Sequence, residues 1–170
     1  AEVTLIHGQT ALPPVKFTTD VPVTTARQMY EAVTSRFDTT DVLIMAAAVA
    51  DYRPATVAND KIKKKEGDLS IPVERTEDIL GTIGPRKIHQ FLCGFSMETR
   101  DLVENSSAKL AKKNLDMVVA NNLKVAGAGF GVDTNVVTFI TPDGTRELPL
   151  MSKADVADAI LDEILRRRAK

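Results

Sequence analysis

The sequence predicts an α/β fold: a three-layer sandwich with a mostly parallel central sheet and a C-terminal β-hairpin. Apolar, strand-like segments alternate along the chain with amphipathic, helix-like segments, which is typical of a parallel sheet covered by helices on both faces. The run 42–49 shows no polar alternation, so we expect a strand buried on both faces near the centre of the sheet. Asp143-Gly144, between two late strand-like segments, predicts the turn of the hairpin.

The expected elements follow in a Rossmann-like order. A helix begins after Thr24 or Thr25, either of which can cap it, and places Met29, Val33 and Phe37 on one face. Thr76 begins a short helix, and Ser152 caps an amphipathic terminal helix with a basic last turn. The remaining helix is expected at 101–113, and strands are expected at 1–7, 16–21, 42–49, 69–74, 89–95, 116–120, 135–140 and 146–150.

Composition excludes several classes of protein. The chain has 170 residues, 44% of them apolar, which fits one globular domain spanning 1–170. A net charge of −1 gives no general attraction to nucleic acid or to a membrane surface. The longest apolar run, 42–50, is far shorter than the ~18 residues that span a bilayer. The single cysteine, Cys93, excludes an internal disulfide and is compatible with the cytoplasm.

Polar residues follow three of the expected strands where each strand ends. Asp51, Tyr52 and Arg53 come directly after the apolar run, the turn 95–98 ends a second strand, and Asn121-Asn122 ends a third. The carboxyl ends of parallel strands form the usual ligand site of an open α/β sheet. Four lysines, at 61, 63, 64 and 65, follow on a segment with little apolar content, which favours a phosphate-rich ligand.

Each of these features also has a purely structural interpretation. Asp51 is also typical of an ordinary turn, Phe95 of a core residue, and Lys64 and Lys65 of a solvated charge run. Lysines four residues apart in a helix, as at 109 and 113, are most often an exposed face. The glycines at 127, 129 and 131 do not make a dinucleotide fingerprint, because valine follows where the third glycine is needed and a strand follows instead of a helix.

Four separated blocks resemble bacterial phosphopantothenoylcysteine synthetase: AAAVADYRP at 46–54, KIKK at 61–64, GFSMET at 94–99 and KNLD at 113–116. The resemblance extends over essentially all 170 residues. It implies a cytoplasmic, CTP-dependent ligase of coenzyme A biosynthesis that joins 4′-phosphopantothenate to L-cysteine through an acyl-cytidylate. It also implies Mg²⁺ as cofactor, a homodimer, and fusion in the full protein to a flavin-dependent decarboxylase, with no flavin in this chain.

The resemblance also implies roles for individual residues. Lys61 matches the catalytic flap lysine, Asp51 faces the ribose or the Mg²⁺ on the triphosphate, and Phe95 packs against the nucleotide. Glu77 replaces the family's usual proline in a segment that lines the nucleotide pocket. The other implied nucleotide-binding residues are Met45, Ala46 and Ala47, whose backbone reads the cytosine, Asp78, Ile79 and Leu80 in the same segment as Glu77, and Lys109 with Lys113 at the phosphates.

The family normally has a further segment ahead of the position of Ala1, which consists of a strand, a turn rich in Gly, Ser and Asn, and a helix. This sequence has no match to that segment. We therefore expect the 170 residues alone to bind CTP weakly and not to complete the reaction. Two other classes stay open. A Rossmann-like dinucleotide-binding oxidoreductase would change NADH fluorescence on binding. A non-catalytic dimerisation module predicts that Lys61→Gln in the complete domain leaves CTP-dependent pyrophosphate release and amide formation intact.

Overall fold

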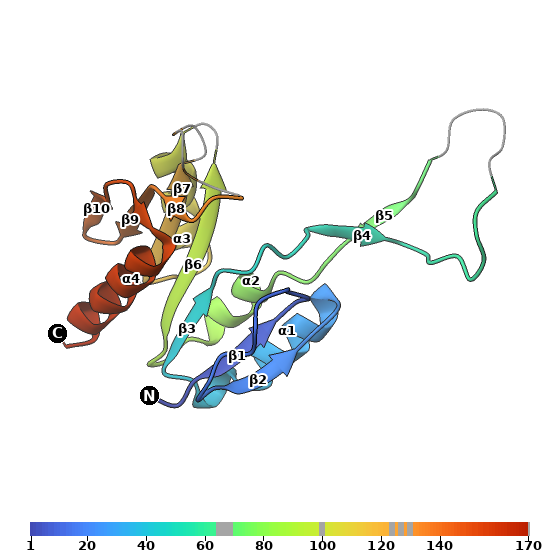
Figure 1. The fold of residues 1–170 in the computed structure, drawn as a ribbon, viewed down its shortest axis with the longest axis horizontal. Helices are drawn as coiled ribbons and strands as arrows, with labels where there is room; N and C mark the ends of the chain where they lie inside the picture. The colour runs from blue at the N-terminus through green and yellow to red at the C-terminus, as the bar shows by residue number, and fades with distance from the viewer. Residues whose placement is uncertain (64–69, 99–100, 123–124, 126–127, 129–130, 170) are drawn as a thin grey trace. The chain divides into compact units, whose positions relative to one another are not determined.

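The computed structural model describes residues 1–63, 70–98, 101–122, 125, 128 and 131–169 (Figure 1). The expectations for Lys64, Lys65, Thr99, Gly127 and Gly129 lie outside this part of the chain. The chain forms two compact units, Ala1–Arg36 with Ala47–Ile79, and Phe37–Ala46 with Leu80–Lys170, which we describe separately. None of the helices described has the length and apolar character that a membrane span requires.

The first unit contains a parallel strand pair and a short helix. Strands β1 (Thr4–His7) and β2 (Thr19–Pro22) pair in parallel, and α1 (Ala26–Thr34) follows. The helix begins at a capping box in which the Thr25 hydroxyl accepts from the Gln28 amide and the Gln28 side chain accepts from the Thr25 amide. The predicted cap is thus confirmed as Thr25, and the predicted inward residues Met29 and Val33 are buried.

An antiparallel ribbon, β4 (Tyr52–Pro54) with β5 (Val73–Arg75), also belongs to this unit. It is held by the Arg53–Glu74 ion pair, with 2.8 Å between Arg53 Nε and Glu74 Oε1. The sequence places 51–53 directly after the apolar run and does not indicate this strand, because the pairing that forms it comes from residues some twenty positions later. The short helix predicted from Thr76 is present but begins three residues later, at Ile79. The Thr76 hydroxyl instead donates to the Ala50 carbonyl at the base of the ribbon.

The second unit is built on a five-stranded sheet of order β10-β9-β7-β6-β3. Strands β3 (Val42–Met45), β6 (Phe91–Glu98) and β7 (Met117–Asn122) run in parallel, whereas β9 (Val137–Thr141) and β10 (Gly144–Glu147) form the predicted antiparallel hairpin. The other elements are η1 (Phe37–Thr39), α2 (Ile79–Ile83, of which Ile79 belongs to the first unit), η2 (Gly84–Arg86), α3 (Leu102–Lys112), α4 (Lys153–Arg168) and the short pair β8 (Thr134–Asn135) with β11 (Met151–Ser152).

Helices cover both faces of this sheet, as the sequence predicts. Val156, Ile160 and Ile164 of α4 pack with Cys93 and Val119 in one core cluster. Strand residues alternate between faces, so position 94 faces the opposite side of the sheet, where a Cβ atom added to Gly94 would meet the side chains of Leu80 and Leu115. The mostly parallel α/β architecture is thus confirmed, and so is the Ser152 cap of α4, whose hydroxyl accepts from the Asp155 amide.

The predicted central position of the run 42–49 was wrong in two respects. Within the five-stranded sheet β3 is an edge strand, and Ile44 is 38% exposed. The strand also ends at Met45, and the alanine-rich segment 46–50 has no regular structure. An apolar run indicates that the side chains on both faces of a strand are buried. It does not indicate whether both edges of the strand are hydrogen-bonded to neighbouring strands. Alanine, moreover, has a low preference for strands.

Ser106, in the middle of α3, has a measurable energetic consequence. Its side chain is fully buried, and its Oγ has no hydrogen-bond partner among the described residues. We expect Ser106→Ala to raise the free energy of unfolding by about 1 kcal/mol, because the unsatisfied hydroxyl is removed and alanine favours the helix. Urea unfolding checks this, with the exposed neighbour Ser107→Ala as control for helix preference alone. A gain no larger than that of the control would contradict the interpretation.

Candidate functional site

The carboxyl ends of three parallel strands meet at one edge of the sheet in the second unit. Met45 of β3 pairs with Gly94 of β6, and Met97 of β6 pairs with Asn121 of β7. A hollow of about 290 Å³ lies at this edge. It is lined by Ala46, Phe95, Met97, Asn121, Asn135, Lys153, Val156, Ala157 and Ile160.

Two of the residues implied by the resemblance, Ala46 and Phe95, line this hollow together. Phe95 is partly buried and packs against the core cluster beneath α4, so one wall of the hollow is aromatic and fixed. Ala46 follows the last residue of β3, and its small side chain leaves the adjacent backbone accessible. An aromatic wall beside accessible backbone groups is typical of a pocket that binds a flat ring.

The hollow also contains polar and cationic groups that the sequence did not indicate. Asn135 donates from Nδ2 to Asn121 Oδ1 over 3.0 Å, which orients the Asn121 amide beside the pocket. Lys153 is the first residue of α4, so an ammonium group and the positive end of a helix dipole meet at the hollow. Only the pairing of β8 with β11, Thr134 opposite Ser152, brings Asn135 and Lys153 here, and no local sequence signal encodes it.

Lys109 lies on the opposite face of the sheet from Phe95. Its Nζ donates to Ser96 Oγ over 3.2 Å and lies 3.3 Å from Glu98 Oε1. The Lys109 side chain is 42% exposed, so this ion pair near the end of β6 stays accessible to solvent. A ligand over the carboxyl edge of the sheet can be approached from both faces, as in other open α/β folds.

The other second-unit residues implied by the resemblance have different surroundings. Met45 is the last residue of β3, and Leu80 packs close to Gly94. Lys113 caps the carboxyl end of α3, one turn beyond Lys109, and its carbonyl oxygen lies against Gly84. Its backbone is therefore held at a tight packing contact, one helical turn away from the Lys109–Glu98 pair.

The remaining residues implied by the resemblance belong to the first unit. The Asp51 carbonyl accepts from the Thr76 amide over 3.0 Å, which joins the segment before β4 to the one that begins with Thr76 and Glu77. Glu77 Oε2 is buried and has no hydrogen-bond partner among the described residues, so an acceptor is available there. Three other residues of this group are exposed: Ala47, Asp78, and Lys61 in the segment beyond β4. The last one, Ile79, has a side chain that is only 4% exposed.

The buried side chain of Ile79 has no surface for a ligand, so only its backbone can contribute to a pocket. Among the described residues no cluster of three or more His, Cys, Asp or Glu side chains could hold a metal by itself. A metal ion would therefore need ligands from a bound substrate in addition to a single carboxylate such as Asp51.

Comparisons with known proteins agree with this architecture. A sequence profile of the family described as the DNA/pantothenate metabolism flavoprotein C-terminal domain matches residues 1–167. The chain is 48% identical over 166 residues to the coenzyme A biosynthesis bifunctional protein CoaBC of Bacillus subtilis, covering 96% of this chain and 41% of that protein. The chain thus spans about two fifths of the length of this curated relative.

Two solved structures have a fold similar to that of this chain. The crystal structure of the C-terminal domain of a coenzyme A biosynthesis bifunctional protein CoaBC is similar with a TM-score of 0.79 and 44% identity, over 98% of this chain and 76% of that one. A Cab2 variant in complex with phosphopantothenate-cysteine shares the fold at 18% identity, with a TM-score of 0.71 over 91% of this chain and 54% of that one. The chain therefore belongs to the family of DNA/pantothenate metabolism flavoprotein C-terminal domains.

Proposed function

We propose that this domain carries out the CTP-dependent ligation of 4′-phosphopantothenate and L-cysteine to 4′-phosphopantothenoylcysteine in coenzyme A biosynthesis. The observation that carries the proposal is the hollow at the strand ends, where Ala46 and Phe95 line one pocket. Both residues are ones that the resemblance assigns to the nucleotide. The 48% identity to a coenzyme A biosynthesis protein supports the pathway.

The proposed reaction has two steps. The carboxylate of 4′-phosphopantothenate attacks the α-phosphorus of CTP, an acyl-cytidylate forms, and pyrophosphate leaves. The amine of cysteine then attacks the acyl carbon, loses a proton, and displaces CMP as the amide bond forms. Such transfers depend mainly on positioning and on neutralising the charge of the phosphates.

The second unit offers groups suited to a nucleotide. Phe95 provides a face for the cytosine ring, and the backbone at Met45 and Ala46 provides hydrogen-bonding groups for its edge. Lys109 is paired with Glu98 and 42% exposed, so a triphosphate with several negative charges competes with one carboxylate for it. Lys113, one turn further along α3, is assigned to the same phosphates.

The first unit contributes the remaining proposed roles. Lys61, exposed in the segment beyond β4, is the proposed catalytic lysine, which neutralises phosphate charge as pyrophosphate leaves. Glu77 Oε2 is an available acceptor for a ribose hydroxyl. Ala47, Asp78, Ile79 and Leu80 are the other residues that the proposal assigns to the nucleotide.

Mg²⁺ fits this proposal as an ion that arrives with the nucleotide. Mg²⁺ usually takes one or two carboxylates, and its other ligands are waters and substrate phosphates, so the single exposed carboxylate of Asp51 suffices. When bound, the ion would withdraw charge from the phosphate oxygens. Asp51 is the residue that would hold the metal or the ribose hydroxyls of the nucleotide.

The family suggests further properties of the whole protein. The relative from Bacillus subtilis is named as bifunctional and is more than twice as long as this chain. We accordingly propose a flavin-dependent decarboxylase in the same polypeptide, a homodimeric assembly and a cytoplasmic location.

Substitution of Lys61 tests the proposed function. We expect Lys61→Gln to lower CTP-dependent pyrophosphate release and amide formation about 100-fold, because a charge that stabilises the transition state is removed. The assay uses the 170-residue chain and a form extended at its amino end as in the relatives, each with 4′-phosphopantothenate and cysteine. Lys16→Gln, at another exposed lysine, is the matched control and should leave the rate unchanged.

Two results would reject the proposal. One is the absence of CTP-dependent pyrophosphate release in both forms of the unsubstituted protein, and the other is full activity of Lys61→Gln, as the dimerisation alternative predicts. A change in NADH fluorescence on mixing with the chain would favour the oxidoreductase alternative instead.

A further inference from the structure

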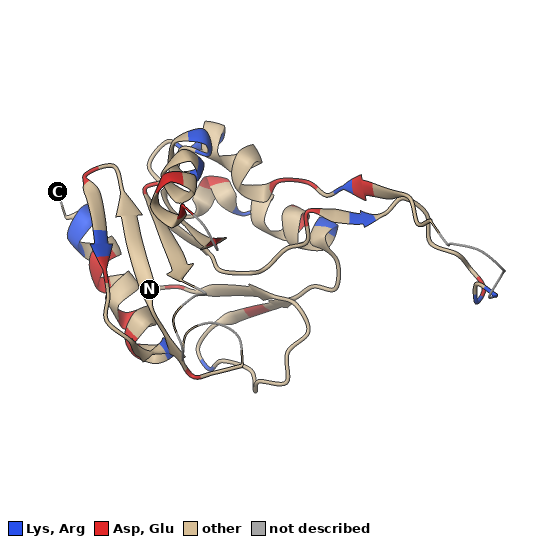
Figure 2. Cartoon of the chain, turned by 90° about the horizontal axis from the view of Figure 1, so that it is seen from above, with Lys and Arg blue, Asp and Glu red and all other residues tan. Residues whose placement is uncertain are grey.

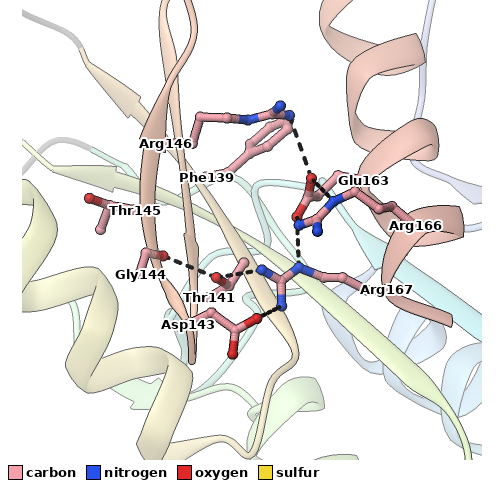
Figure 3. A pocket seen from close by; sticks show the side chains of 9 residues that line it. All are labelled: Phe139, Thr141, Asp143, Gly144, Thr145, Arg146, Glu163, Arg166 and Arg167. Atoms are coloured by element: carbon pink, nitrogen blue, oxygen red, sulfur yellow. Dashed lines mark hydrogen bonds and ion pairs between the residues drawn. The ribbon is translucent and has the colours of Figure 1, made fainter. Parts of the chain in front are cut away.

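A second hollow, of about 330 Å³, lies where the last turns of α4 face the β9–β10 hairpin (Figure 3). Its charged lining residues are Asp143 and Arg146 from the hairpin and Glu163, Arg166 and Arg167 from the helix. Lys153, which lines the strand-end hollow, is at the other end of α4, about 20 Å from Arg166 at ~1.5 Å per residue. The two hollows are therefore separate sites.

Glu163 holds three guanidinium groups around one carboxylate, as Figure 3 shows. Arg166 donates from Nη2 to Oε1 over 2.6 Å and from Nε to Oε2 over 3.1 Å, and Arg167 donates from Nε to Oε1 over 2.7 Å. Arg146 Nη2 lies 3.6 Å from Oε2. Hydrogen bonds from Arg166 and Arg167 lower the pKa of Glu163 to about 2, so the carboxylate is ionised at neutral pH.

Arg167 has a structural role in this cluster. Its side chain is 15% exposed, and besides Glu163 it donates to Asp143 Oδ2 over 3.0 Å and to Thr141 Oγ1 over 2.8 Å. All three of its nitrogens thus have partners, and they tie the end of α4 to the turn of the hairpin. Arg167 has little capacity left for a ligand.

Arg146 and Arg166 differ from Arg167 in their exposure. Their side chains are 57% and 53% exposed, and a guanidinium group has five N–H donors. Within the described residues Arg146 approaches Glu163 through Nη2 alone, and Arg166 uses Nε and Nη2. Arg146 is also held over the Phe139 ring, 5.3 Å from its centroid. Both guanidinium groups are thus fixed in place while they keep donors for a further acceptor.

We propose that Arg146 and Arg166 form a binding site for a tetrahedral oxyanion, either inorganic phosphate or the phosphate group of a phosphomonoester. Arg146 Nη2 and Arg166 Nε both lie near one oxygen, Glu163 Oε2, so the two groups are close enough for a single small anion to bridge them. A tetrahedral anion has enough oxygens to accept hydrogen bonds from the N–H groups of two guanidinium groups at once. The two oxygens of a planar carboxylate are already satisfied by the paired N–H groups of one guanidinium.

Charge and volume agree with this ligand. Three arginines against Asp143 and Glu163 leave one formal positive charge at the hollow, and in Figure 2 the last turn of α4, beside the C label, is basic. The hollow is within the ~300–1,000 Å³ range of small-molecule sites. Because Glu163 orients the arginines before any ligand arrives, little side-chain entropy is lost on binding.

Residue-resolved NMR titration tests the site. The ¹⁵N-labelled 170-residue chain is titrated with inorganic phosphate, and separately with glycerol phosphate, at constant ionic strength. We expect saturable shifts of the amides of 144–146 and 163–167, and we expect Arg146→Gln to raise the dissociation constant at least tenfold. Arg146→Gln combined with Arg166→Gln should abolish the shifts. If glycerol phosphate binds more tightly than phosphate, the natural ligand is an ester, and the reverse order indicates the free ion.

The matched control is Arg27→Gln, because Arg27 is also an exposed helical arginine paired with one carboxylate, Glu31, but does not line this hollow. It should leave the dissociation constant unchanged. Three results would overturn the proposal: shifts that do not saturate, equal shifts with acetate, or binding retained by the doubly substituted chain. If the double variant does not fold, Arg146→Gln decides alone, since its exposed side chain is on the edge strand β10. The outcome is independent of CTP-dependent activity, because it is read at the hairpin and at the end of α4.

Discussion

Gly84→Ala is expected to lower the free energy of unfolding by about 3 kcal/mol or more. Gly84 begins η2 and is buried, and a Cβ atom on it would lie 2.1 Å from the carbonyl oxygen of Lys113 and 2.9 Å from the carbonyl carbon. Both are backbone atoms, so no side-chain rotation relieves the overlap. The clash would also disturb the hydrogen bond of 2.9 Å from Asn114 Nδ2 to the Gly84 carbonyl.

Chemical denaturation of the two proteins measures this difference. Gly8→Ala is the control, because a Cβ there has no neighbour within 4 Å, and we expect it to change stability by less than about 1 kcal/mol. Equal stabilities of Gly84→Ala and the unsubstituted chain would show that the end of α3 can move away from η2 at no cost.

Glu163→Gln is expected to cost about 3 kcal/mol at neutral pH. The Glu163 side chain is 6% exposed and accepts bonds from Arg166 and Arg167, which are strong because both partners are charged. Glutamine keeps one acceptor oxygen and turns its NH₂ group either toward Arg166 Nε or toward Arg166 Nη2 and Arg167 Nε. In both orientations an arginine donor loses its acceptor, and the nearly buried Arg167 loses the negative charge beside it. Unfolding in urea at pH 7 measures the loss, and Glu147→Gln, at an exposed carboxylate of β10, should change stability by less than about 0.5 kcal/mol.

The same substitution predicts a pH dependence. The pKa of Glu163 is lowered in the folded protein, to about 2 from an ordinary value of 4.5, because Arg166 and Arg167 favour the ionised carboxylate. The ionised group therefore stabilises the fold above pH 4.5, and this contribution is lost as the pH falls from there towards 2. The stability difference between the unsubstituted chain and Glu163→Gln should shrink over that interval. A difference that stays constant between pH 7 and pH 3 would contradict the proposed origin.

Features with a local cause were predictable from the sequence. Thr25 and Ser152 cap their helices through side-chain bonds to residues three positions later, and such short-range geometry follows from residue type and spacing. The hairpin was predictable for the same reason, since Gly144 adopts a φ of 138° that favours glycine. The convergence of polar residues at the ends of β6 and β7 follows from the parallel order of these strands.

Features created by distant pairings were not predictable. The β4–β5 ribbon joins Tyr52 to Arg75 across a segment without periodicity, and β3 is an edge strand although its sequence looks central. Lys109 looked like a free helix-face lysine and is paired with Glu98. Ile79, which the resemblance assigns to the nucleotide, has a buried side chain, so only its backbone is left for that role. In each case the contact that determines the outcome joins residues too far apart in the sequence for helix or strand periodicity to indicate it.

The sequence by itself determined the fold class, the helix caps, the family and a set of residues at strand ends, because these depend on local conformational preference and on recognisable blocks of residues. Only the tertiary structure decided that Ala46 and Phe95 line one hollow together with Lys153. Likewise, only the tertiary structure decided that Glu163 of α4 forms an ion pair with Arg146 of β10. The physical reason is that electrostatic and packing contacts act over a few ångströms in space. The chain brings such residues together through its overall path, which no local pattern encodes.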